Sequence, residues 1–438
     1  MAYMMKTKTF PRTSVLLVVF FLIAASTSLT RGIVGSAFSS PGVIVVEAGQ
    51  SIAQAVGRAS VGDILFVKNG IYDESGITVN KSLSIVGEST ENTVIDGQST
   101  IQVIFQIVAG NVTLENLTLR NTSPDPFAQA PAVRIFGVAG VKVQNITLIN
   151  SAVGVELRSA NSSQVLRCKI YGCSATGILL RDKSCGNNFV GNSIVNSAAG
   201  IRFADTSSEG NRIYHNNFQN NTVQVSSFGG ANFFDNGYPS GGNYWDGYVY
   251  EDVRSGVNQD QSGSDGILDR GYSFDNYPMA NPITNVDIRE AGREFYLQCS
   301  TNITTDGWSF SILEKNLRFL VSSQQIATSA TRVEIPKELL SCENMNGWAI
   351  SLHDSNPIGL QYLSMEDSED TYLYFTYNMV GDGEVQIIGT DAIPELSLSA
   401  VLVFLIAVTA LISAVVVKGS NAKKCSRELL ECWLCLQG

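Results

Sequence analysis

Three segments of the chain share one pattern: GVELRSA at residues 154–160, GILLRDK at 177–183 and GIRFADT at 200–206. Their glycines are 23 residues apart, and in each segment the first and third residues after glycine are apolar. Apolar residues at every second position are typical of a β-strand that buries one face. Because the strands recur at a fixed spacing, we interpret them as copies of one repeating unit.

A second family of positions recurs in step with the first. Ile170, Ile194 and Phe218 are 24 residues apart, and Cys168 is in step with two of the asparagines. Asparagine tolerates left-handed backbone, and its amide can hydrogen-bond to an identical amide on the next repeat. We therefore expect the recurring asparagines to be structural. They are Asn187 and Asn211, Asn192 and Asn216, and Asn196 and Asn220.

A unit of about 23 residues is too short to fold alone, but stacked units bury a continuous core and pair their backbones with each other. The period and the strand alternation exclude ankyrin and tetratricopeptide repeats. A leucine-rich repeat has a compatible period, but its leucine and asparagine pattern is missing. We therefore predict an all-β fold with a right-handed parallel β-helix over residues 42–235. SIAQAVGRA at residues 51–59 predicts a short helix, with Ser51 as its N-cap, that covers the first coil.

Two long stretches resemble a known family. The opening, with SIAQAVGRASVGDILFVKNGIYDE, NKSLSIVGE and TVIDG between residues 51 and 97, is similar to NosD-like and pectin-esterase-like β-helix proteins. The stretch GGNYWDGYVYEDVRSGVNQDQSGSDGILDRGYSFDNYPM at residues 241–279 resembles the segment that closes the helix in NosD-like surface proteins of archaeal type. The similarity extends through IPKELL, FTYN, VQIIGT and IPE. This resemblance implies periplasmic copper binding, or carbohydrate binding and sugar hydrolysis.

The repeat stops after the β-helix. We expect residues 236–284, rich in acidic residues, Gly, Tyr and Trp, to close the helix. Alternating pieces such as TRVEIP, WAISLH, TYLYFTYN and EVQIIG then occur at sandwich-like spacing. They predict an immunoglobulin-like β-sandwich over residues 285–391, serving as a stalk or an adhesion module.

Both ends of the chain carry targeting signals. Three basic residues precede a short apolar run at residues 15–25, which predicts a signal peptide over residues 1–37, with an uncleaved anchor as the alternative. Residues 396–417 contain no charge and are long enough to cross a bilayer, although a buried core helix would share this pattern. Basic residues follow, so residues 418–438 should be a cytoplasmic tail. We therefore expect a single-pass protein on the extracellular face of the cell membrane.

The net charge of −11 argues against a nucleic-acid partner.

The cysteines and the glycosylation motifs fit an oxidising compartment outside the cell. Cys299 and Cys342 lie in one predicted domain and could form a disulfide. Eight sequons also predict a glycoprotein, although a chain rich in Asn, Ser and Thr forms sequons by chance. They begin at Asn80, Asn111, Asn116, Asn121, Asn145, Asn161, Asn220 and Asn302.

Six aspartates cluster in the closing segment among glycines and a serine. Close carboxylates repel unless a cation neutralises them, and hard oxygen ligands favour Ca²⁺. The segment does not match the twelve-residue calcium loop of EF-hands, and a solvated acidic loop is the plainer alternative. A bound ion would stiffen this junction as a structural Ca²⁺. The candidate ligands are Asp246, Asp252, Asp260, Asp265, Asp269 and Asp275.

Copper, which the resemblance implies, is disfavoured by the residues themselves. Copper sites use His, Met and Cys ligands. The two histidines, His215 and His353, lie in different predicted domains. We expect His215 to be a surface or turn residue at a coil corner.

Alignment by the glycine repeat places several charged residues in one strip. Arg158 lies over Arg181, Asp182 lies over Asp205, and Arg202 is nearby. Arginine binds carboxylates through two hydrogen bonds, so the strip could hold a sugar acid. A polysaccharide lyase or glycoside hydrolase could also use such charged pairs, and an ordinary soluble surface has the same composition.

Beside the acidic segment, Trp245 lies among several tyrosines. Aromatic rings can stack on sugars, but a cluster of this kind more often covers the end of an apolar core. No nucleophile elbow, zinc-protease motif or phosphate-binding loop is present. Taken together, the sequence predicts a non-catalytic surface protein that binds carbohydrate or cell-envelope components. A lyase or hydrolase acting on acidic glycans is the alternative, and metal delivery is less favoured.

Overall fold

The computed structural model describes residues 41–127, 130–226, 230–354 and 357–392. The chain divides into two compact units, Met1–Gly42 and Val43–Gly438, and every described helix and strand belongs to the second. The predicted signal peptide, transmembrane helix and tail lie outside the described residues. Among the residues that are described, no helix is long and apolar enough to cross a membrane.

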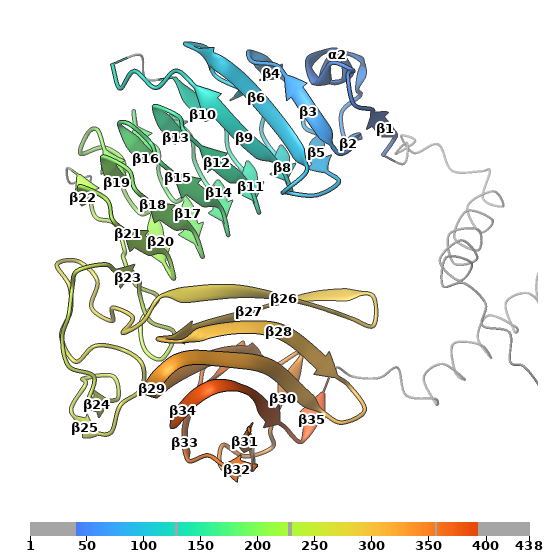
Figure 1. The fold of residues 1–438 in the computed structure, drawn as a ribbon. Helices are drawn as coiled ribbons and strands as arrows, with labels where there is room; N and C mark the ends of the chain where they lie inside the picture. Colours follow the sequence, from blue (N-terminus) through green and yellow to red (C-terminus); the bar gives the residue numbers. More distant parts are fainter. Residues whose placement is uncertain (1–40, 128–129, 227–229, 355–356, 393–438) are drawn as a thin grey trace, which may run out of the picture. The chain divides into compact units, whose positions relative to one another are not determined.

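Three parallel sheets form the first part of this unit, and Figure 1 shows their strands stacked coil upon coil. Sheet A consists of β1 (Val43–Val46), β2 (Ile64–Val67), β5 (Ser84–Gly87), β8 (Thr113–Glu115), β11 (Lys142–Gln144), β14 (Gln164–Leu166), β17 (Asn188–Val190) and β20 (Arg212–Tyr214). Sheet B consists of β3 (Gly70–Asp73), β6 (Thr93–Thr100), β9 (Thr118–Thr122), β12 (Thr147–Ile149), β15 (Lys169–Tyr171), β18 (Ser193–Val195), β21 (Asn217–Gln219) and β23 (Tyr244–Trp245). Sheet C consists of β4 (Ile77–Val79), β7 (Phe105–Ile107), β10 (Pro131–Phe136), β13 (Val153–Arg158), β16 (Thr176–Arg181), β19 (Ala199–Phe203) and β22 (Val223–Ser226).

The strand register confirms the predicted right-handed parallel β-helix. In sheet C, Val155 pairs with Ile178, and Ile178 pairs with Ile201. All three side chains are fully buried in one core. Residues 23 apart therefore lie one above another in a shared interior, as the repeat predicted.

The repeated glycines bring the coils close together. A Cβ on Gly177 would lie 2.6 Å from a methyl carbon of Ile194 and 2.7 Å from the carbonyl oxygen of Gly200. No side chain fits at such distances, because real Cβ atoms do not approach other atoms this closely. Glycine is therefore required by space at this position.

Two of the three predicted asparagine pairs form hydrogen-bonded ladders inside the turns, whereas Asn196 and Asn220 are exposed and have left-handed backbone. The amide nitrogen of Asn192 donates to the side-chain oxygen of Asn216 at 2.9 Å, and Asn216 donates in the same way to Asn243. A second ladder joins Asn187 to Asn211. These asparagines are fully buried, so each ladder satisfies polar groups that water cannot reach.

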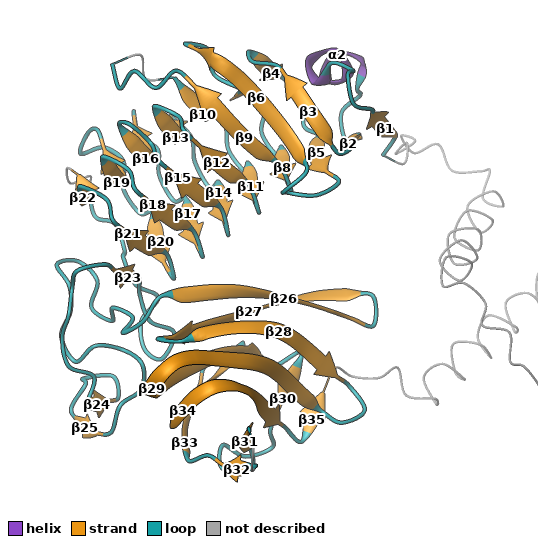
Figure 2. Cartoon of the chain, in the orientation of Figure 1, coloured by secondary structure: helices purple, strands orange, loops and turns teal. Residues whose placement is uncertain are grey.

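The one helix in the described residues is α2 (Ile52–Arg58), which Figure 2 shows beside the first coils. The Ser51 hydroxyl accepts a hydrogen bond from the backbone N–H of Gln54, which confirms the predicted N-cap. Ile52 and Val56 are buried in the core of the β-helix. The helix therefore covers the apolar end of the first coil.

Aromatic rings cover the other end of the core. Trp245 pairs with Phe218 in sheet B, and the two rings stack with centroids 4.5 Å apart. Trp245 is 2% exposed. The predicted covering role of this cluster is therefore confirmed. Two short strands, β24 (Arg254–Ser255) and β25 (Gln261–Ser262), pair farther along the closing segment.

Antiparallel strands follow, as predicted, and most belong to one continuous sheet. The sheet consists of β26 (Ile283–Glu290), β27 (Arg293–Thr301), β28 (Thr304–Ser311), β29 (Asn316–Pro336), β31 (Ala349–His353), β32 (Ile358–Gly359), β33 (Tyr362–Glu366) and β34 (Asp370–Ile388). A small second sheet pairs β30 (Leu340–Ser341) with β35 (Asp391–Ala392). The two long strands β29 and β34 pair over most of their length, with an irregularity between Ser323 and Ala327. Figure 1 shows both strands strongly curved.

The predicted disulfide is wrong. Cys299 is buried near the end of β27, and both Cys299 and Cys342 are free thiols. Burial raises the pKa of the Cys299 thiol to about 12, which keeps it protonated and unreactive.

Candidate functional site

A polar cavity of about 490 Å³ lies between corners of the last β-helix coils and the antiparallel sheet. We call it the His215 cavity. Hydrogen bonds join the β-helix to the antiparallel sheet beside the cavity. The side chain of Asn217 donates to the carbonyl oxygen of Ile283 and accepts from its N–H, and the side chain of Asn285 donates to the carbonyl oxygen of Gly191. The lining residues used below are Arg167, Tyr214, His215, Ser240, Asn285, Tyr296, Gln298, Glu334, Asp367, Glu369 and Asp370.

On the β-helix side, the cavity is formed by corners between sheets A and B. Each corner has one residue in the left-handed backbone region. That residue is Asn116, Asn145, Arg167, Gly191 or His215 in five successive coils, with φ between 49° and 69°. Glycine and asparagine are common in this conformation and histidine is enriched in it, whereas arginine makes it costly. Arg167 therefore occupies a strained position, and such strain is concentrated at functional sites.

His215 is buried rather than exposed, which corrects the expectation of a surface residue. Its ring is 4% exposed, and Nε2 lies 3.1 Å from the carbonyl oxygen of Ser240. A carbonyl oxygen can only accept, so Nε2 carries the proton and donates. Nδ1 then faces the carboxyl group of Glu334, 3.6 Å away. Burial lowers the pKa of His215 to about 4, so the ring is neutral at physiological pH.

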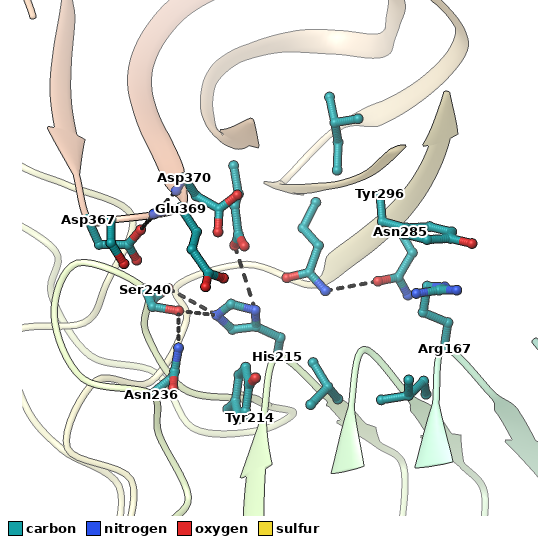
Figure 3. Close-up of a pocket in the computed structure, with 16 residues that line it drawn as sticks. Arg167, Tyr214, His215, Asn236, Ser240, Asn285, Tyr296, Asp367, Glu369 and Asp370 are labelled. Carbon is teal, nitrogen blue, oxygen red and sulfur yellow. Dashed lines mark hydrogen bonds and ion pairs between the residues drawn. The ribbon is translucent and has the colours of Figure 1, made fainter. Parts of the chain in front are cut away.

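Carboxyl groups with opposite pKa shifts gather beside this histidine, and Figure 3 shows Asp367, Glu369 and Asp370 at one end of the cavity. Burial raises the pKa of Glu334 to about 7, and burial together with the charge of Glu334 does the same to Asp370. For Asp367, burial is outweighed by hydrogen bonds from the N–H groups of Asp370 and Glu369 and from the Tyr372 hydroxyl, so its pKa is lowered. The cavity thus holds protonatable and ionised carboxyl groups together at neutral pH.

Aromatic and amide groups form the opposite end of the cavity (Figure 3). The guanidinium carbon of Arg167 lies 3.5 Å from the centre of the Tyr296 ring. Gln298 donates to the side chain of Asn285 at 2.9 Å. This end offers a flat stacked surface with hydrogen-bonding groups beside it.

The raised pKa values predict how stability depends on pH. Unfolded Glu334 and Asp370 have ordinary pKa values of 4.5 and 3.8, so the stabilisation from their folded-state protons is complete below those values and is lost as pH rises through about 7. His215 acts in the opposite sense, but only below its ordinary pKa of 6.5. We therefore expect the melting temperature to rise when the pH falls from about 8 to about 6.5, as measured by differential scanning fluorimetry.

The variant Glu334→Gln should make that rise shallower, because it removes one of the titrating groups. Glu338→Gln is the control, since the Glu338 side chain is 73% exposed and lies outside the cavity. A Glu334→Gln protein with the full wild-type slope would show that Glu334 does not titrate in this range.

The predicted Arg/Asp strip lies on the outer face of sheet C and its following turns. Arg158 and Arg181 are adjacent in register, and the backbone N–H of Asp182 donates to the Asp205 carboxylate at 2.6 Å. Arg202 pairs with Leu179, one row away. The structure therefore brings the strip together.

The strip's arginines already have partners within the protein. Arg158 forms an ion pair with Asp182 at 2.6 Å, and Arg181 forms one with Glu156 at 2.7 Å. Glu156 is 1% exposed and also pairs with Arg134. A sugar acid at this surface would have to compete with these carboxylates.

The six acidic residues of the closing segment are not gathered around one point. Most of them accept hydrogen bonds from backbone N–H groups: Asp246 from Asn220, Asp252 from Asp265 and Gly266, Asp265 from Ile267, Asp269 from Val253 and Arg254, and Asp275 from Asn243 and Tyr277. Asp260 is exposed. In the described part of the chain, no group of three or more His, Cys, Asp or Glu residues is placed to hold a metal. Structural calcium stays a prediction.

Copper fits the described residues poorly. His215 is the one histidine among the residues that line the cavity, and its Nε2 is hydrogen-bonded to the carbonyl oxygen of Ser240. His353 lies in β31 and bonds the Ser351 hydroxyl. No Met or Cys lines the His215 cavity, and Met279, which lines a separate small hollow with His215, would be the one soft ligand beside this histidine among the residues lining these two spaces.

The sequence did not single out the carboxyl groups of the cavity. Glu334, Asp367 and Asp370 come from β29, the turn before β34 and the start of β34, more than 100 residues from the His215 corner. One feature of the sequence could have indicated the β-helix side of the cavity. When the repeats are aligned, Arg167 and His215 occupy the corner position at which the neighbouring coils have Asn or Gly.

Comparison with known proteins agrees with the fold. Residues 133–249 match the model of a family described as periplasmic copper-binding protein (NosD). The NosD-like resemblance predicted from the sequence is therefore confirmed for this part of the chain. No curated protein sequence matches.

Solved β-helix structures are distantly similar. They include the catalytic domain of a GH87 alpha-1,3-glucanase in complex with nigerose (18% identity, TM-score 0.39, covering 46% of this chain and 40% of that domain). Pectin methylesterase PemA from Erwinia chrysanthemi has 16% identity and a TM-score of 0.22, over 41% of this chain and 72% of that one. Tailspike gp49 of Acinetobacter baumannii bacteriophage Fri1, a capsular polysaccharide depolymerase, has 11% identity and a TM-score of 0.22, over 84% and 74%. Such similarity does not indicate a shared activity.

Proposed function

We propose that this protein is a carbohydrate-binding β-helix protein and that one sugar unit binds in the His215 cavity. The observation that carries the proposal is the lining: carboxyl, amide and hydroxyl groups converge on a space of about 490 Å³, with Tyr214 and Tyr296 in its wall. Cavities of several hundred Å³ hold small ligands. Hydroxyl groups of a sugar can donate to the carboxylates, and the aromatic faces can pack against its ring.

The acidic side chains that line the cavity disfavour a negatively charged sugar. Glu334, Asp367, Glu369 and Asp370 line it, against the single cation Arg167 among its lining residues. A uronic acid at this end would meet like charges, which disfavours binding. We therefore propose a neutral or amino sugar here, in place of the acidic glycan considered for the Arg/Asp strip.

Cell-surface attachment completes the proposed function. It rests on the sequence of residues 1–37 and 396–438, which lie outside the described residues. In this proposal the immunoglobulin-like antiparallel domain separates the β-helix from the membrane, and the glycan partner belongs to a cell envelope or surface.

Isothermal titration calorimetry tests the proposal with oligosaccharides of N-acetylglucosamine, glucosamine and galacturonate. We expect binding of the first or second and at least tenfold weaker binding of the third. Asp370→Asn should weaken glucosamine binding, whereas Asp306→Asn, at an exposed position of β28, should not. Absence of binding by all three sugars, or equal binding of galacturonate, would contradict the proposal.

Glycoside hydrolysis is a second candidate. The observation in its favour is the pair of opposite pKa shifts: Glu334 retains a proton near neutrality, whereas Asp367 is ionised. Glu334 would give its proton to the leaving oxygen as the glycosidic C–O bond breaks, and Asp367 would take a proton from the water that forms the new C–O bond at the sugar carbon. Release of reducing ends from the bound oligosaccharide, lost in Glu334→Gln, would establish hydrolysis. Binding without product would leave the protein a binding module.

A further inference from the structure

The His215 cavity is one end of a longer groove. Two more hollows, of about 300 and 470 Å³, follow the same corners toward the first coils. Arg167 lines all three spaces, Asn285 joins the first to the second, and Asn145 and Asp287 join the second to the third. The third hollow reaches Glu88, at the end of β5. We call the three spaces together the corner groove.

The groove has the dimensions of a polymer site. It passes the corners at His215, Gly191, Arg167, Asn145 and Asn116, and neighbouring coils are about 4.8 Å apart. Residues of β26 line the opposite side. The proposed sugar unit occupies the His215 cavity, so the rest of the groove is available to further units of the same chain.

The second hollow is lined by two cations, Arg167 and Lys169, and by one carboxylate, Asp287. Lys169 follows Arg167 in the chain, lines the second and third hollows and has an exposed side chain. The coils on either side have threonine and serine at the position of Lys169, since Lys169 pairs with Thr147 and Ser193. Across the groove, Arg289 pairs with Glu294 and Asp287 lies near Arg167. Arg167 and Lys169 therefore place two cations in one coil, at positions where the neighbouring coils have neutral residues.

The backbone of Arg167 supports the same conclusion independently of charge. Arginine is held at φ 52° in a corner where the preceding coil has asparagine. At this corner position, the side-chain amide of Asn145 donates a hydrogen bond to the side-chain oxygen of Asn116 at 2.8 Å. Arg167, at the same position of the next coil, does not extend this row of asparagine hydrogen bonds. Asparagine would suit this backbone better, whereas the guanidinium group stacks on Tyr296 and lies near Asp287 in the wall of the groove.

From these observations we infer that the corner groove binds an acidic heteropolysaccharide, with a neutral or amino sugar in the His215 cavity and the carboxylate of the next unit on Arg167 and Lys169. This inference rests on the proposed function and adds the length and the charge pattern of the ligand. Arginine and lysine both bind carboxylates through charge-assisted hydrogen bonds. A homopolymer of uronic acids would place a carboxylate in the acidic cavity as well.

The test compares three probes on the full chain by calorimetry: chitobiose, chitin hexasaccharide and hyaluronan hexasaccharide, in which N-acetylglucosamine alternates with glucuronate. We expect chitobiose to bind and the hyaluronan hexasaccharide to bind at least tenfold more tightly than the chitin hexasaccharide. Raising the salt concentration should remove most of this difference, because it screens the exposed charges.

Variants separate this inference from the proposed function. Lys169→Thr restores the residue of the neighbouring coil, and Lys169 does not line the His215 cavity. This variant should lower hyaluronan affinity at least fivefold and leave binding by the chitin hexasaccharide nearly unchanged. Lys183→Asn is the matched control, because Lys183 is exposed, has φ 65° and lies outside the groove. Chitobiose binding without any preference for hyaluronan would overturn the inference alone. Absence of binding both by chitobiose and by the glucosamine oligosaccharides would overturn the proposed function as well.

Discussion

Replacing Asn192 by alanine is expected to lower the free energy of unfolding by about 4 kcal/mol. The Asn192 side chain is fully buried and makes three hydrogen bonds, each at 2.9 Å: it accepts from the N–H of Cys168 and donates to the Val165 carbonyl and to Asn216. Alanine removes all three bonds, although the Asn216 oxygen keeps the one that it accepts from the backbone N–H of residue 192, and each lost bond costs about 1–3 kcal/mol. Denaturant unfolding followed by circular dichroism measures the change.

Asn196 provides the control for this prediction, because it is an asparagine of the same coil with an exposed side chain. It has φ 56°, a conformation that glycine adopts easily. Asn196→Gly should therefore change the free energy of unfolding by less than about 0.5 kcal/mol. Equal losses in the two variants would mean that the ladder does not stabilise the β-helix.

The coil could be predicted from the sequence because each coil repeats the same physical requirements. Val155, Ile178 and Ile201 face one core, so their alternation with outward residues is visible in the sequence. A buried turn favours an amide that bonds the coils on both sides of it, as Asn192 bonds Val165 in the preceding coil and Asn216 in the next. Because each coil has the same requirements, the same residue types recur in the sequence at the length of one coil.

The functional site could not be predicted in the same way. The His215 cavity exists because β29 and β34 begin or end beside the coil corners, and no repeat relates Glu334 to His215. The long curved strands also depend on tertiary packing, which an alternating pattern does not specify. Sequence alone therefore favoured the Arg/Asp strip, whose residues the repeat does align.

The strip also shows where repeat alignment reaches its limit. Alignment placed Arg158 beside Arg181 correctly, but it did not identify Glu156 as their neighbour in the next row. Glu156 is buried between Arg134 and Arg181, which neutralise it. A residue's row follows from its position in the repeat, whereas the direction of a long side chain depends on the charges that surround it.

Arg332→Met is expected to lower the free energy of unfolding by about 3–5 kcal/mol, because it removes a buried charge that joins β29 to the closing segment. Arg332 is 2% exposed and donates to the backbone carbonyls of Asp265, at 2.7 Å, and Pro239. Methionine retains most of the packing volume but leaves these carbonyls unpaired. Denaturant unfolding measures the loss. Because Pro239 adjoins Ser240, which bonds His215, Arg332→Met should also weaken sugar binding in the cavity.

Arg318→Met is the control for this prediction, because Arg318 lies on the same strand but near the surface. Its side chain is 36% exposed and pairs with exposed Glu314, so its loss should cost less than about 1 kcal/mol. It should also leave sugar binding unchanged, since Arg318 does not line the cavity. Unchanged stability of Arg332→Met together with unchanged binding would mean that the Arg332 contact does not hold the cavity in place.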